Sequence, residues 1–152
     1  MAGMEGLGRI FNVVPVCTAG GAINFRDCSA ISFVITGSTA VPTLTFGKTF
    51  GGSYDSGATA ACNPITRVYW STSTTGTVAW AKATITAAAT FTLGSTTGLT
   101  TATAAVFTVL ASEIPDPYQY IKCTVTGSGI GAAILHDLAV QRAPANLAKV
   151  SA

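Results

Sequence analysis

Charged residues are scarce in this chain. Only 9% of its 152 residues are Asp, Glu, Lys or Arg, whereas an ordinary soluble domain carries about 25%. The basic residues are scattered along the chain, which argues against nucleic acid as a partner. A folded chain of 15.3 kDa exposes roughly 7,000 Å², or about 500 Å² per charged residue. Because exposed apolar patches above about 400 Å² promote association, we expect another protein to cover part of the surface. Much of the uncharged material is Thr, Ser and Gly, so an uncharged solvated surface is the alternative.

A membrane-spanning segment is also missing. Mean hydropathy is high, at +0.51, and the stretch Ala83–Ser112 contains no ionisable side chain. Thr and Gly interrupt that stretch repeatedly, whereas a spanning helix needs about 20 predominantly apolar residues. The first residues lack the basic and apolar regions of a secretory signal. The sequence therefore predicts a protein made in the cytoplasm, with no membrane as a partner.

The cysteines lack the spacing of a metal or redox site. Cys17, Cys28, Cys62 and Cys123 are isolated, and no C-x-x-C pair occurs. We interpret all four as small buried hydrophobic residues. No cofactor and no metal is expected.

Groups suited to catalysis are few. The single histidine, His136, precedes Asp137, but neighbours on a strand point to opposite faces and cannot form a hydrogen-bonded dyad. No serine lies in a G-x-S-x-G or S-x-x-K motif. Glu113, Asp116 and Asp137 could converge on a cation, although solvated turn residues are the simpler interpretation. We expect no enzyme.

Two further patterns have structural explanations. Gly127, Gly129 and Gly131 resemble a phosphate-binding loop, but they lie between two expected strands, whereas a dinucleotide motif opens a helix. We therefore predict a hairpin there. Aromatic side chains could line a carbohydrate or single-strand groove, and burial in the core is the favoured alternative. They are Tyr54, Tyr69, Trp70, Trp80, Tyr118 and Tyr120.

Short runs of Thr, Val, Ile and aromatic residues are what the sequence does contain. Gly and Pro separate these runs about every ten residues, which predicts an all-β fold, a single-domain antiparallel β-sandwich or barrel. Period-two alternation directs one set of side chains inward. In the first half this set is Ile31, Phe33, Ile35, Leu44 and Phe46.

The middle of the chain predicts two hairpins. Gly47–Pro64 is rich in Gly and turn residues and indicates a long hairpin or an exposed excursion. Arg67–Ser71 and Thr77–Thr86 form a second hairpin, with Trp80 as its bulky anchor. Ala104–Leu110 is either a buried strand or one short helix. Between these elements, Gly94–Thr103 is a neutral Gly/Thr loop, where we expect contact with another subunit.

The final strand pair shows the clearest alternation. From Tyr118 to Thr126, one face receives Ile121, Cys123 and Val125, and Tyr118 lies on the other. In the closing strand Ile134, His136, Leu138 and Val140 share a face. We divide the chain into an N-terminal arm (1–11), a β-sandwich domain (12–141) and a C-terminal arm (142–152). Both arms need another surface to become ordered.

The order of the predicted segments along the chain resembles that of a known protein family. A short arm reaches Asn12–Val16, the strand Asp27–Ile35 follows, and a turn comes at Gly37. After a central hairpin region, a Pro-rich turn leads into Tyr120–Thr126, then a Gly/Ala hairpin, a closing strand and a tail. This arrangement resembles the small capsid decoration, or cement, proteins of tailed bacteriophages.

The resemblance implies a structural protein of the virion. It would bind the outer face of an icosahedral capsid as a homotrimer and stabilise the shell, with the major capsid protein as partner. Alternatives are another phage structural β-protein, such as a tail-tube or head-fibre subunit, and a carbohydrate-binding or adhesive module. The expected interface residues are neutral or lie in the arms: Arg9, Ile10, Phe11, Thr97, Thr100, Arg142, Pro144, Leu147 and Val150.

Overall fold

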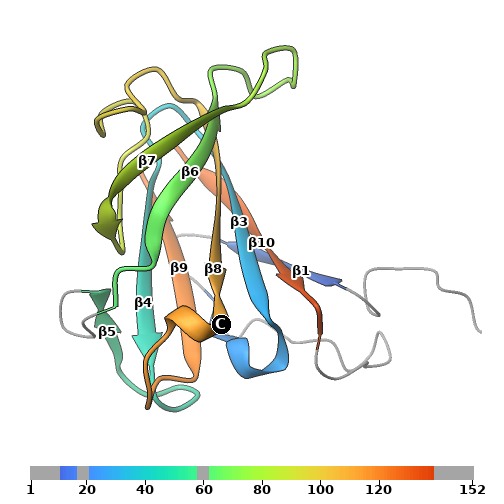
Figure 1. Ribbon diagram of the computed structural model, residues 1–152, viewed down its shortest axis with the longest axis vertical. Helices are drawn as coiled ribbons and strands as arrows, with labels where there is room; N and C mark the ends of the chain where they lie inside the picture. The colour runs from blue at the N-terminus through green and yellow to red at the C-terminus, as the bar shows by residue number, and fades with distance from the viewer. Residues whose placement is uncertain (1–10, 17–20, 58–61, 139–152) are drawn as a thin grey trace, which may run out of the picture.

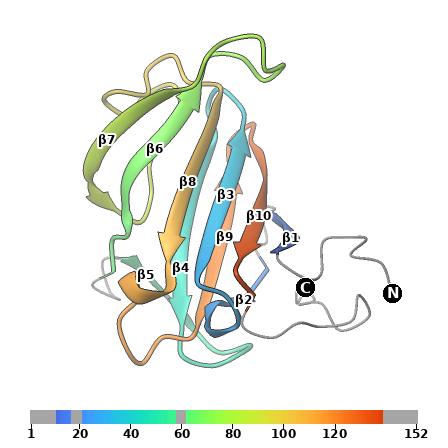
Figure 2. The same cartoon turned by 45° about the vertical axis from the view of Figure 1, so that its right-hand side comes forward.

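Two antiparallel β-sheets stacked face to face form the fold (Figures 1 and 2). The computed structural model describes residues 11–16, 21–57 and 62–138. The all-β sandwich expected from the sequence is therefore confirmed. The two short 3-10 helices are η1 (Phe25–Asp27) and η2 (Ala111–Glu113). In the described ranges, no helix is long and apolar enough to cross a membrane.

Six strands form the larger sheet and four form the smaller one. The larger sheet contains β1 (Phe11–Val16), β3 (Ala30–Thr36), β6 (Ile65–Ser71), β7 (Ala81–Ala88), β8 (Ala104–Leu110) and β10 (Ile130–His136), in the order β1-β10-β3-β8-β6-β7. The smaller sheet contains β2 (Ile23–Asn24), β4 (Val41–Gly47), β5 (Tyr54–Ser56) and β9 (Tyr120–Thr126), in the order β2-β9-β4-β5. In Figure 2 strands β3, β8 and β10 lie in front of β4 and β9.

The core fills the space between the sheets. As expected, the inward residues of β3, β4 and β9 are buried. Ala104–Leu110 is a strand, and its Phe107 stacks on Phe33 at 5.1 Å between ring centroids. Phe91 meets the same Phe107 ring edge-on at 5.3 Å. These aromatic contacts join β3, β8 and the segment after β7 in one core.

The closing strand faces the other way from what its largest residues suggest. Ile134 and His136 share a face, but that face points outward, while Ala133 and Leu135 are buried. In the register with β3, Ala133 lies opposite the large Phe33. Both faces of β10 carry apolar residues, so hydrophobicity alone could not assign the inner one. Leu138 follows the strand, and Val140 lies outside the described residues.

The turn Gly127–Gly131 is not a hairpin, so that prediction is wrong. Strand β9 pairs with β2 and β4, whereas β10 pairs with β1 and β3, so the chain crosses here between the sheets. Gly127 has φ +77°, which favours glycine. At Gly129 a Cβ atom would collide with Ala40. The turn can therefore press closely against the neighbouring crossing between β3 and β4.

Two aromatic residues differ from the strand pattern, although burial of the first agrees with the core position favoured for the aromatic residues. Tyr118 is only 9% exposed because it precedes β9 and packs against Phe46, with ring centroids 6.2 Å apart. Its hydroxyl donates to Asp55 Oδ2 at 2.9 Å, which raises the pKa of the phenol. Trp80 does not anchor the β6–β7 hairpin, since it is 49% exposed and precedes β7, whereas Trp70 packs against the core.

The segment from Thr90 to Thr103, which contains the neutral loop, belongs partly to the core. Phe91, Leu93, Leu99 and Ala102 are buried, although this segment forms no strand beyond one bridge to β4. Apolar residues in the loop therefore close one end of the sandwich. The hairpins β4–β5 and β6–β7 pair as expected.

Candidate protein-interaction surface

Four neighbouring strands of the large sheet carry no formal charge. Strands β1, β10, β3 and β8 are adjacent, and none contains Asp, Glu, Lys or Arg. We call the outward side of these four strands the neutral face. From strand spacing and rise it measures roughly 19 by 23 Å, or about 440 Å². The largest apolar patch on a single chain is typically about 300–600 Å² and often functional, and this face combines apolar side chains with the polar Ser32, Thr108 and His136.

An apolar row crosses the neutral face. The strand registers place Ala132 beside Val34, Val34 beside Val106, and Val106 beside Tyr69 on β6. The first three side chains are partly exposed, and Tyr69 is 49% exposed. This row was not singled out from the sequence, because it exists only once the strand order is known.

Hydroxyl groups and the histidine form a short network below this row. His136 Nε2 lies 2.9 Å from Ser32 Oγ, and Ser32 Oγ lies 2.8 Å from Thr108 Oγ1. A serine next to a histidine suggests a nucleophile and its base, but catalysis also needs a group that orients the imidazole. The neighbouring carboxylate of Asp137 instead accepts the hydroxyl of Ser29, at 2.8 Å. As expected, no His136–Asp137 dyad forms.

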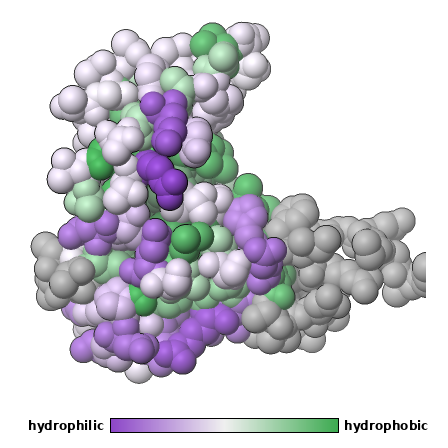
Figure 3. All heavy atoms as spheres, viewed as in Figure 1, coloured by the Kyte–Doolittle hydropathy of each residue, from purple (hydrophilic) through white to green (hydrophobic). Residues whose placement is uncertain are grey.

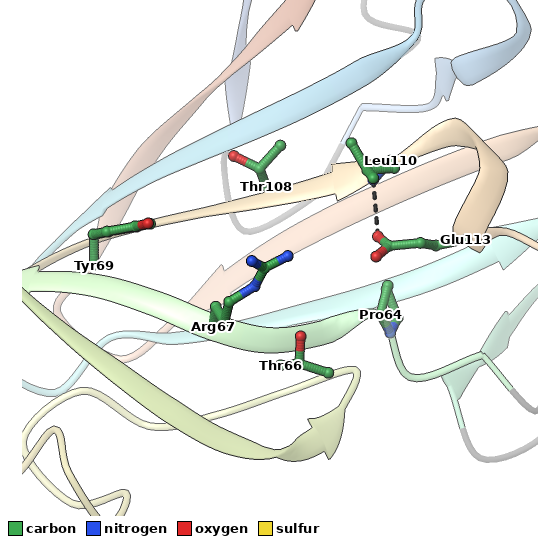
Figure 4. Close-up of a pocket in the computed structure, with 7 residues that line it drawn as sticks. All are labelled: Pro64, Thr66, Arg67, Tyr69, Thr108, Leu110 and Glu113. Carbon is green, nitrogen blue, oxygen red and sulfur yellow. Dashed lines mark hydrogen bonds between the residues drawn. The ribbon is translucent and has the colours of Figure 1, made fainter.

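A cleft opens beside the neutral face, between β6 and β8. These strands pair only from Tyr69–Val106 to Ser71–Ala104 and then separate. The resulting cavity has a volume of about 230 Å³. In Figure 4 the guanidinium of Arg67 projects into the space between the strands, with Tyr69 at one end and Glu113 at the other. We call this the Arg67 cleft.

An irregularity in the β6–β7 pairing accompanies the cleft. Ile65 pairs with Ala88 and Arg67 with Thr84, so Thr66 faces three residues of β7. Such bulges bend a strand and increase its twist. Thr66 and Arg67 are both exposed, which breaks the inward-outward alternation of β6. The extra residues belong to β7, so the bulge lies along the edge of β6 opposite to the cleft.

The charges on this side of the molecule lie at the margins of the neutral face. Arg67 on β6 and Lys82 on β7 are the basic residues of those two strands. Figure 3 shows hydrophilic residues as a short column in the upper half, along the lower rim and in smaller groups at mid-height, with paler and greener surface around them. The face therefore combines a neutral centre with a basic border on the β6–β7 side.

Three of the expected interface residues lie in the described part of the chain, and of these only Phe11 belongs to a strand of the neutral face. Thr97 and Thr100 are exposed in the loop beyond β7, and Thr97 borders a groove of about 280 Å³ beside that strand. Phe11 begins β1, and its side chain is not described. The other expected positions lie outside the described residues: Arg9, Ile10, Arg142, Pro144, Leu147 and Val150.

The three carboxylates have separate partners. Glu113 Oε2 accepts the backbone N–H of Leu110 at 2.9 Å, and Asp116 lies 3.6 Å from Arg26 in an exposed ion pair. Asp137 accepts Ser29, as described above. In the part of the chain that the structure describes, no group of three or more metal-ligating side chains converges.

The described cysteines are buried, as the sequence predicted, and the structure shows them to be free. Burial raises the pKa of Cys28 to about 12, with help from the charge of Asp27. Burial likewise raises the pKa of Cys123 to about 12 and, together with Glu113, that of Cys62 to about 11. Cys17 lies outside the described residues. These three thiols are therefore neutral at physiological pH and poor nucleophiles.

The aromatic residues are divided between the two sheets. Tyr54 and Tyr120 belong to strands of the small sheet, whereas Tyr69 faces outward on the large one. Tyr118 is buried. They do not line one common groove. Comparison with models of protein families, with curated proteins and with solved structures found no match to this chain.

Proposed function

We propose that the chain is a decoration, or cement, protein that binds the outer surface of an icosahedral phage capsid and stabilises the shell. Its partners would be the major capsid protein and two further copies of itself. The neutral face is the observation that carries this proposal. A surface of four adjacent uncharged strands supports this proposal, because covering it with another protein would desolvate no charged side chain of these strands.

The size of the neutral face fits a contact that is repeated many times. A standard stable interface buries about 800 Å² on each partner, and the neutral face supplies roughly 440 Å². One such contact is weak. A trimer bound to three equivalent positions of a shell gains affinity because the second and third contacts form at high effective concentration.

Two separate surfaces are available for the two kinds of contact. The neutral face would meet the capsid, and the loop that carries Thr97 and Thr100 would meet the next subunit of the trimer. The loop groove is lined by uncharged residues of β7 and of the loop itself. A tail-tube or head-fibre subunit would use similar surfaces, so position on the particle separates these alternatives.

A matched pair of variants tests the proposal. Val34 and Val41 are both partly exposed valines, Val34 on β3 of the large sheet and Val41 on β4 of the small sheet. Each change to Glu should reduce strand stability by about 1 kcal/mol. Only Val34→Glu should weaken attachment to purified capsids, by tenfold or more, because it buries a charge in the contact.

Cosedimentation with capsids measures attachment, and electron microscopy locates the bound protein. Binding at the capsid surface that Val34→Glu weakens and Val41→Glu preserves supports the proposal. Equal effects of the two variants on attachment would show that the neutral face does not contact the capsid. A location inside the tail would replace the decoration function by the tail-tube alternative.

A further inference from the structure

We propose that the Arg67 cleft binds an extended peptide segment of a partner protein through a carboxylate side chain of that segment. The inference rests on the proposed function only for the partner's identity, which would be the capsid protein. The site itself follows from the geometry of β6 and β8.

The guanidinium of Arg67 is available for binding. Among the residues that the structure describes, no ion pair or hydrogen bond engages it. Glu113 shares the cleft without forming an ion pair with Arg67, and its Oε2 accepts the Leu110 amide. Arginine presents paired N–H donors that match the two oxygens of a carboxylate. An acidic side chain is therefore the complementary ligand.

The walls of the cleft favour a peptide over a small molecule. Its volume, about 230 Å³, is below the range of about 300–1,000 Å³ typical of small-molecule sites. Tyr69 and Leu110 supply exposed apolar walls, and Thr108 supplies a hydroxyl. The cleft thus suits one side chain of a longer segment.

The two strands offer backbone groups along the same cleft. Strand β6 pairs with β7 on one edge and β8 pairs with β3 on one edge, but their facing edges part beyond Tyr69 and Val106. Unpaired strand edges bind extended peptides through main-chain hydrogen bonds. An entering segment would pair with these edges while its acidic side chain reaches Arg67.

Charge favours a foreign partner over a second copy. The chain carries a formal net charge of +2, and Lys82 adds a second cation at the strand next to Arg67. A second copy would bring the same net positive charge to this border, whereas an acidic segment complements it.

Binding of a defined peptide tests the cleft without any capsid. The full chain, labelled with ¹⁵N, is titrated with a capped peptide that alternates Thr and Val around one central Glu, and with the same peptide carrying Gln. The Glu peptide should bind about tenfold more tightly, because a charge-assisted hydrogen bond is lost in the Gln peptide. Amide shifts should map to β6 and β8.

Variants then test which residues of the cleft cause the preference for the Glu peptide. Arg67→Gln should abolish the preference for Glu, and Arg67→Lys should reduce it severalfold, because the paired donors are lost. Glu113→Gln should strengthen binding of the Glu peptide about twofold, since a like charge is removed. Lys48→Gln, an exposed cation of the β4–β5 connection, is the matched control and should change nothing.

The outcomes separate the cleft from the proposed function. Equal affinity for the two peptides, a preference that survives Arg67→Gln, or shifts outside β6 and β8 would overturn the cleft assignment, whatever happens on capsids. If the preference holds but the wild-type chain does not attach to capsids, the cleft assignment stands and the decoration function fails.

Discussion

The outward faces of the two sheets differ in the contacts that their side chains make with one another. On the small sheet, Lys122 Nζ lies 4.3 Å from the centroid of the Tyr54 ring, and Phe50 packs against Tyr120 at 5.8 Å. Gly47 leaves room for the Tyr54 ring, which would collide with a Cβ atom there. On the large sheet, Val34 and Val106 adjoin each other with no charged neighbour on their strands.

The two outward faces therefore differ in the contacts that their side chains make within the chain. On the small sheet Lys122 lies over the Tyr54 ring, although Phe50 beside Tyr120 remains 59% exposed. The neutral face carries a partly exposed apolar row and, at its border, an arginine without a described partner. Apolar area of this kind gains free energy only when another surface covers it.

The largest effect on folding is expected beneath both faces, in the core. Phe107→Ala removes the ring that contacts Phe33 and Phe91 and should lower the free energy of unfolding by about 3–5 kcal/mol. Urea denaturation measures the loss. Thr108→Ala, on the outward side of the same strand, should cost about 1 kcal/mol through its bond to Ser32. Equal losses would mean that β8 contributes little to the core.

The buried thiols should make stability fall in alkali. Their folded pKa values, about 12 for Cys123 and Cys28, lie above the ordinary value of 9.0. The unfolded chain therefore releases these protons first, and their stabilising contribution is complete below pH 9 and declines as the pH rises toward 12. Cys123 alone should contribute a slope of up to about 1.4 kcal/mol per pH unit.

Urea denaturation between pH 8 and 10.5 measures this slope. Cys123→Ala, compared at each pH with the wild type, should show a shallower decline although it is less stable at pH 8. Parallel declines in the two proteins would indicate that Cys123 is not shielded from solvent between the sheets.

A smaller effect on stability is expected on the outward face of the small sheet. Lys122→Met removes the cation over Tyr54 and should lower the free energy of unfolding by about 0.5–1 kcal/mol without changing capsid attachment. Lys82→Met, on the exposed strand β7, is the matched control and should leave stability unchanged. A loss of attachment in Lys122→Met would mean that the small sheet also binds the partner.

The smallest effect on folding is expected at the loop tip. Thr97→Lys changes an exposed side chain and should alter the free energy of unfolding by less than about 0.5 kcal/mol. If the loop contacts the next subunit, the added charge should reduce the mass measured by sedimentation. An unchanged oligomer would place the loop in solvent.

Local pattern predicted much of the fold and little of the surface. Alternation identified the inward residues of β3, β4 and β9, because polar and apolar residues alternate there. It did not identify the inner face of β10, where Ile134 is larger than Ala133 yet points outward. The turn after β9 was assigned to a hairpin because its glycines look the same whether the chain returns in one sheet or crosses to the other.

The scarcity of charge in Ala83–Ser112 has two explanations that the sequence could not separate. Part of the stretch is core, since Leu93 and Leu99 close one end of the sandwich. Another part, in β8, joins the neutral face. Uncharged residues of this stretch are thus buried in the core in one part and lie on the neutral face in another.

By itself, the sequence determined the fold class, the inward residues of several strands and the shortage of charge, because these depend on residue type and on a period of two. Tertiary structure decided which uncharged strands became neighbours. Strands β3, β8 and β10 lie far apart in the chain, and only their pairing brings three neutral segments into one surface. Pairing also decided where β6 and β8 separate, and so where the Arg67 side chain is left between them.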